Sequence, residues 1–150
     1  MPTKLNLSLP PELENERTHY HSLIVSSLNH VVFWFGDVGF TVDPDEIITD
    51  AVVYNDTDLL RSGMAEVFGI PLDQIIKTFC GTVHDKTLSI LSIEKYESIY
   101  KTLYPDYQWN EDCYKKLAIH ELAHKAHALI ATILSHLCID GEASGRLYPR

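Results

Sequence analysis

Hydrophobic residues recur with a helical period in four stretches of the chain. In the first, they are Leu23, Ile24, Leu28, Val31, Val32 and Phe35. A spacing of three or four residues places side chains on one face of an α-helix. Ser8 and the prolines that follow it are typical of a helix start, and Gly36 and Gly39 of a helix end. We therefore expect one helix over residues 8–35.

The same period predicts helices over residues 55–71, 93–105 and 110–142. Asp56 is the expected N-cap of the second helix, and Asn110 that of the last. Tyrosines recur at every third or fourth position of the third stretch, which is typical of a side that packs against a core. These tyrosines are Tyr96, Tyr100, Tyr104 and Tyr107. The last stretch is apolar nearly all round, and such a helix is typically buried.

Strands are expected in the middle of the chain. Residues 47–54 are rich in Ile and Val, and residues 74–83 and 88–93 resemble the two strands of a hairpin with a turn at 84–87. Residues 42–46 indicate another turn. The order helix, strand, helix, hairpin, helix, helix predicts an α+β fold. Its small antiparallel or mixed sheet would pack against the helices.

Length and charge narrow the class of protein. A chain of 150 residues fits a single domain over residues 1–150, and its 45% hydrophobic and 22% charged residues are typical of a folded chain. The net charge is −9, and the Lys and Arg residues form no cluster. An acidic chain without a basic face is a poor ligand for nucleic acid or for an anionic membrane, so we expect neither as a partner.

Cysteine usage and apolar runs indicate a location. The three cysteines are Cys80, Cys113 and Cys138, an odd number without the paired spacing of a disulfide framework. Such usage is typical of a reducing compartment. Residues 1–17 lack the apolar run of a signal peptide, and the longest apolar run, residues 31–35, is too short to span a bilayer. We therefore expect a cytoplasmic protein.

The stretch with recognisable chemistry is His120-Glu121-Leu122-Ala123-His124, which has the spacing H-E-x-x-H. His124 lies roughly 40° round the helix from His120, so two imidazoles one turn apart can share a metal ion. Glu121 lies roughly 100° from His120, where it can accept a proton from water beside the metal. The motif therefore predicts Zn²⁺, with His120 and His124 as ligands and Glu121 as catalytic base. The alternative is a buried polar network without metal.

The motif and the residues before it resemble the zincin metallopeptidases, especially the very small ones. The resemblance covers about residues 74–142 and rests on the hairpin "FCGTVHDKTLSILS", an intervening helix and "HELAH". It implies a zincin-like fold and a peptide or protein substrate. In zincins an edge strand binds the extended peptide, so main-chain groups of the matching strand would bind substrate here. These residues are Gly81, Thr82, Val83 and His84. The alternative is an ordinary internal strand pair.

A zinc site needs at least three protein ligands, and the third is open. The sequence resembles the glutamate branch of the zincins, in which an acid follows the motif; Glu142 matches that acid, although the order of Gly and Glu is changed. A helix unbroken to Ile139 would rise about 22 Å past His124 and keep Glu142 from the metal. The rival is His127, roughly 20° from His120 on the same face, where three ligands would crowd each other.

The sequence thus predicts a zinc-dependent peptidase, in which a water activated by metal attacks a peptide bond. The first alternative is a zincin-shaped protein without catalysis that serves as a binding or regulatory module. A second alternative is a helical protein that binds metal through His120, His124 and His127 and has no hydrolytic role.

Overall fold

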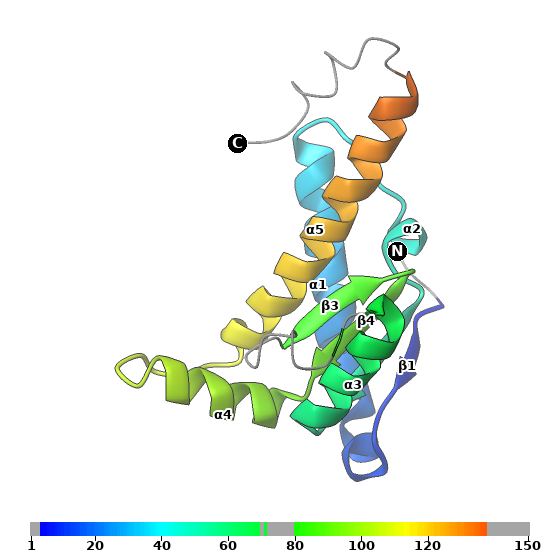
Figure 1. Ribbon diagram of the computed structural model, residues 1–150. Helices are drawn as coiled ribbons and strands as arrows, with labels where there is room; N and C mark the ends of the chain where they lie inside the picture. Colours follow the sequence, from blue (N-terminus) through cyan, green and yellow to red (C-terminus); the bar gives the residue numbers. More distant parts are fainter. Residues whose placement is uncertain (1–3, 70, 72–79, 138–150) are drawn as a thin grey trace.

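Four strands form a mixed sheet in the computed structural model, which describes residues 4–69, 71 and 80–137 (Figure 1). The strands are β1 (Asn6–Ser8), β2 (Asp50–Tyr54), β3 (Gly81–His84) and β4 (Thr87–Leu91). Their order across the sheet is β1-β2-β4-β3. Strands β1, β2 and β4 run parallel, and β3 runs antiparallel to β4. The described residues therefore form an α+β fold with a mixed sheet, in agreement with the prediction.

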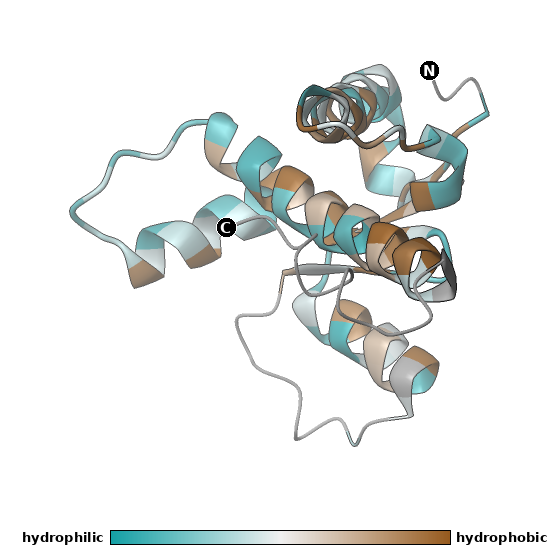
Figure 2. Ribbon diagram, turned by 90° about the horizontal axis from the view of Figure 1, so that it is seen from above, coloured by the Kyte–Doolittle hydropathy of each residue, from teal (hydrophilic) through white to brown (hydrophobic). Residues whose placement is uncertain are grey.

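Helices cover both faces of this sheet. They are the 3₁₀ helix η1 (Pro11–Glu16) and the α-helices α1 (Arg17–Asp37), α2 (Pro44–Ile47), α3 (Thr57–Phe68), α4 (Ile93–Leu103) and α5 (Asp112–Leu137). Helices α1 and α5 pack side by side on one face, and α3 lies on the other (Figure 1 and Figure 2). Helix α4 extends away from the sheet (Figure 1). No helix in the described part of the chain is both long and apolar enough to cross a bilayer.

The main hydrophobic core lies between the sheet and the helices α1 and α5. Alternate residues of β2 and β4 belong to it, because successive side chains of a strand point to opposite faces. These residues are Ala51, Val53, Leu88 and Ile90. A second, smaller core on the side of α3 contains Leu60, Met64, Cys80 and Leu91. The face of the sheet toward α1 and α5 is thus buried, whereas on the face toward α3 the residues of β2 and β4 other than Leu91 are half-buried.

Capping and turn residues in the sequence predicted two element boundaries correctly. The side chain of Asp56 accepts hydrogen bonds from the backbone N–H groups of Asp58 and Leu59, which confirms the N-cap of α3. The turn predicted at residues 84–87 is confirmed as well. Asp85 and Lys86 have φ angles of 50° and 63°, the left-handed pair that a two-residue hairpin turn requires.

The prediction for the first helix is wrong at its start. Ser8 belongs to β1, where it pairs with Val52 of β2, and α1 begins only at Arg17. Pro10 and Pro11 lack backbone N–H groups, and the turn between them and α1 is 3₁₀-helical. Strand β1 has three residues, which is too short to show an alternating pattern in the sequence.

The turn predicted at residues 42–46 contains a short helix, α2. Pro44 occupies its first turn, and the side chain of Asp43 accepts a hydrogen bond from the N–H of Asp45 at 3.0 Å. Strand β4 ends at Leu91 because the Ser92 side chain caps α4 by accepting from the N–H of Lys95. Of the first hairpin strand, residues 74–79 lie outside the described residues, and β3 begins at Gly81.

The expectation that the last helix is buried is correct for one face only. The buried residues of α5 recur every fourth position: Tyr114, Ala118, Leu122, Ala126 and Ile130. Residues two positions away from them, such as His120 and His124, are exposed. The sequence did not reveal the exposed side, because Ala123 and Ala126 lie between the histidines and alanine is compatible with either side of an amphipathic helix.

Candidate metal centre

Helix α5 holds all three residues of the H-E-x-x-H motif. Its buried stripe, centred on Ala118 and Leu122, packs on α1 and the sheet. His120 and His124 project from the exposed side, while Glu121 is half-buried. The two imidazoles are therefore accessible to solvent, and burial does not force them to find partners as the sequence had indicated.

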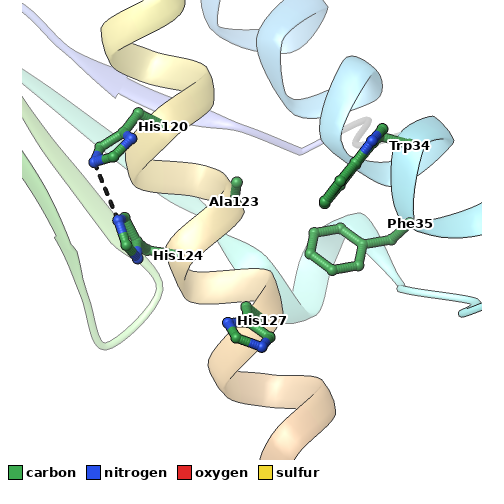
Figure 3. A pocket seen from close by; sticks show the side chains of 6 residues that line it. All are labelled: Trp34, Phe35, His120, Ala123, His124 and His127. Atoms are coloured by element: carbon green, nitrogen blue, oxygen red, sulfur yellow. Dashed lines mark hydrogen bonds between the residues drawn. The ribbon is translucent and has the colours of Figure 1, made fainter. Parts of the chain in front are cut away.

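The rings of His120 and His124 lie one above the other on α5 (Figure 3). Their Nε2 atoms are 3.1 Å apart, and the ring planes are inclined at 83°. At this distance the N–H of one ring donates a hydrogen bond to the bare nitrogen of the other. Zinc bonds imidazole nitrogen at about 2.0–2.1 Å, so two tetrahedral ligands lie roughly 3.3 Å apart. The two nitrogen atoms are thus close to the separation that one shared ion needs.

The described residues bring two of the three predicted ligands together. Within residues 4–69, 71 and 80–137, no three His, Cys, Asp or Glu side chains are grouped so that they could hold a metal ion. Glu142, the expected third ligand, lies outside the described residues. His127 lines the same cavity as His120 and His124 but forms no such group with them. Imidazole nitrogen is a donor that zinc accepts, and the spacing of His120 and His124 suits a shared ion, so these two residues fit zinc.

A cavity of about 270 Å³ lies beside the histidines, between α5 and α1. Trp34 and Phe35 of α1 and Ala123 of α5 complete its lining (Figure 3). The rings of Trp34 and Phe35 meet edge to face, with their centroids 4.7 Å apart. Phe35 and Ala123 give this lining an apolar part, and its polar groups are the indole N–H of Trp34 and the imidazole nitrogens.

Glu121 faces a different part of the molecule. It lines a second cavity with Gly81 of β3 and Tyr96 of α4, and the two histidines are not among the residues that line it. Burial raises the pKa of the Glu121 carboxyl, and the nearby His124 opposes that shift. A carboxylate whose pKa lies above the usual range is a better proton acceptor, which suits a general base.

Strand β3 passes close to Glu121. A Cβ atom added to Gly81 would lie 3.8 Å from Cγ of Glu121 and 3.3 Å from the carbonyl oxygen of Ser89. The distance to Glu121 is an ordinary van der Waals contact, so the close approach that glycine permits here is the one to the Ser89 carbonyl of β4. In the described sheet β3 is the last strand, paired with β4 along Gly81–His84. The predicted substrate edge therefore coincides with an outer strand beside the glutamate.

Sequence reasoning missed the role of the tyrosines on α4. Tyr96 packs against the core as expected, but Tyr104 and Tyr107 are 50% and 68% exposed. Tyr96, Tyr100 and Tyr104 line the cavity that contains Glu121. The spacing correctly predicted that Tyr96 and Tyr100 share one face of a helix, whereas Tyr104 and Tyr107 lie beyond Leu103, where α4 ends. Only the position of α4 relative to α5 shows what this face meets.

Comparison of the chain with protein-family models, with characterised proteins and with solved structures found no match. The resemblance to the zincins thus rests on the motif and its surroundings alone, and it stays a prediction.

Proposed function

We propose that this protein is a zinc-dependent peptidase. The observation that carries the proposal is the pair of Nε2 atoms of His120 and His124, 3.1 Å apart, with Glu121 between them in the sequence and β3 beside it. Two imidazoles at chelating distance, a half-buried carboxylate and an outer strand are among the parts that such an enzyme needs, together with a third metal ligand.

In this proposal His120 and His124 would hold the ion. The third ligand would be Glu142 or its rival His127, and α5 continues to Leu137, about 20 Å past His124, before the residues that lead to Glu142 begin. When bound, zinc lowers the pKa of water and polarises the carbonyl that is attacked. Glu121 accepts the proton that water loses and passes it to the leaving amine. The raised pKa of its carboxyl favours the first of these transfers.

The substrate proposed for this enzyme is an extended peptide. Strand β3 is paired on one side with β4, and the backbone groups of Gly81 and Val83, which point to the other side, would hydrogen-bond to the peptide. Because β3 runs past Glu121 at Gly81, a peptide added to this edge would pass over the motif. The edge thus gives the substrate a direction and a register relative to the base.

The test combines metal analysis with hydrolysis of a mixed peptide library. We expect the wild-type chain to bind one Zn²⁺, and to cleave peptides only when zinc is bound. Glu121→Gln should retain zinc and lose at least about 10²-fold in rate, since general base catalysis contributes about 10²–10⁴-fold. Glu66→Gln changes an exposed acid on α3 and serves as the control.

A second candidate function is a catalytically silent protein of the same shape that binds or regulates a partner. The observation that favours it is the absence of a three-ligand group within the described residues. Zinc binding without hydrolysis of any library peptide, by a folded chain, would favour this candidate. If neither His120→Ala nor His124→Ala weakens zinc binding, the proposed metal centre is wrong.

A further inference from the structure

A cavity of about 280 Å³ lies between α4, the start of β3 and α5, and the paired histidines are not among the residues that line it. Its lining includes Cys80, Tyr96, Tyr100, Tyr104, Leu117 and Glu121. Ligand cavities in proteins typically measure about 300–1,000 Å³, so this one fits a single side chain or a small molecule.

Glu121 is the charged residue in this lining, which contains no Lys, Arg or His. Its side chain is half-buried, and within the described residues it forms neither a hydrogen bond nor an ion pair. Lys125, one helical turn away, is not paired with it there. His124 acts on this carboxylate electrostatically, but no hydrogen bond replaces the water that the carboxylate loses on burial, and that loss costs free energy. A positively charged group in the cavity would offset that cost.

The aromatic wall of the cavity suits a cation as well. The rings of Tyr96 and Tyr100 are inclined at 48°, and those of Tyr100 and Tyr104 at 49°, so successive rings form a curved surface rather than a flat stack. Trp109 lies against Tyr96 and Tyr100, with centroid distances of 5.6 Å to each. The faces of such rings carry negative potential and attract ammonium groups within about 6 Å.

Helix α4 leaves this wall accessible. None of its residues is fully buried, although its apolar side is continuous from Tyr96 to Leu103. Tyr100 packs against Trp109, and the nearby Cys113 side chain raises the pKa of Tyr100. The wall is thus positioned by its contacts with α5 while its cavity side stays open.

We infer that this cavity binds an organic ammonium group, held by the Glu121 carboxylate and by the rings of Tyr96 and Tyr100. A trimethylammonium ligand and the ammonium end of a lysine side chain share this chemistry. The inference does not rest on the proposed peptidase function, because neither zinc nor hydrolysis enters into it. If Glu121 is also a catalytic base, such cations would compete with its reaction.

The experiment is a fluorescence titration of the zinc-free chain in chelator, in a Trp34→Phe background that leaves Trp109 as the reporter. The probes are choline, Nα-acetyl-lysine amide and 3,3-dimethylbutan-1-ol, a neutral molecule with the shape of choline. We expect saturable changes with at least one cation, and binding at least about tenfold weaker for the neutral probe. Preference between the two cations distinguishes a free small molecule from a peptide side chain.

Variants locate the binding. Glu121→Gln and Tyr100→Leu should each weaken cation binding about tenfold, and Tyr100→Phe, which keeps an aromatic face, should change it less than about threefold. Glu94→Gln and Tyr107→Leu alter the same residue types outside the cavity and should have no effect. Circular dichroism checks that each variant is folded. Equal affinity for choline and the neutral alcohol, no saturation by either cation, or equal losses in Glu121→Gln and Glu94→Gln would overturn the inference.

Discussion

At the scale of single residues, the exposure of each group decides its chemistry. His120 and His124 are exposed and face each other, so their ring nitrogens are open to a ligand from solvent. Glu121, next to His120 in the sequence, is half-buried because it turns toward β3. One residue of helix separates an open imidazole from a shielded carboxylate, since each step rotates the side chain by about 100°.

The cysteines provide a prediction at this scale. Burial raises the pKa of the Cys80 thiol to about 11, whereas Cys113 is only partly buried. The thiolate is the form that reacts, so at pH 8 Cys80 should be alkylated more slowly than Cys113. The Cys80 rate should still rise with pH beyond 9, because its folded-state pKa is raised. Iodoacetamide labelling of a Cys138→Ser chain, read by peptide mass spectrometry, measures both rates; equal rates at pH 8 would contradict the burial of Cys80.

At the scale of elements, α5 depends on its buried stripe. Leu122 is fully buried at the centre of the motif, whereas Ile133, eleven positions later, is 58% exposed. The same helix thus offers a buried and an exposed aliphatic residue for comparison.

Leu122→Ala should lower the free energy of unfolding by about 2–5 kcal/mol, because it removes a buried side chain and leaves a cavity. Ile133→Ala is the matched control and should cost less than about 1 kcal/mol. Urea denaturation measures both changes. Similar losses in the two variants would show that the buried side of α5 is not the one described.

The start of α3 gives a second prediction for an element. The side chain of Asp56 accepts two backbone hydrogen bonds there, so Asp56→Ala should destabilise the protein by about 1 kcal/mol. Asp56→Asn keeps an oxygen acceptor and should cost much less. Thermal unfolding of the three proteins compares them. If alanine and asparagine are equally harmful, the charge of Asp56 matters more than its hydrogen bonds.

At the scale of the whole molecule, the proposed zinc centre predicts a change in stability. A ligand that binds only the folded chain adds stability that grows with the logarithm of its concentration. Zinc at 100 times its dissociation constant should therefore raise the free energy of unfolding by about 2.7 kcal/mol. Differential scanning calorimetry with and without chelator would detect this change.

The corresponding variants are His120→Ala and His124→Ala. Both positions are exposed, so the substitutions themselves should cost little stability, and the response to zinc should be lost. His19→Ala removes an exposed histidine on α1 that bonds to Glu111, and its response to zinc should remain. An unchanged zinc response in both motif variants would place the ion elsewhere.

Much of the local structure followed from the sequence alone. The cap at Asp56, the turn at Asp85-Lys86 and the pairing of two histidines one turn apart all depend on residues within a few positions of each other. Interactions over so short a range are set by backbone geometry and side-chain type, so periodicity and turn chemistry could predict them. The H-E-x-x-H motif is another such short-range feature, because its three polar residues lie within five positions of the chain.

Tertiary structure decided the rest. The parallel pairing of β1 with β2, the outer position of β3 and the exposure of His120 depend on contacts between distant residues. The cavity that joins Glu121 to the tyrosines of α4 also exists only because α4, α5 and β3 meet there. Such contacts depend on which surfaces pack together, and hydrophobic periodicity shows that a helix has an apolar side but not what that side meets.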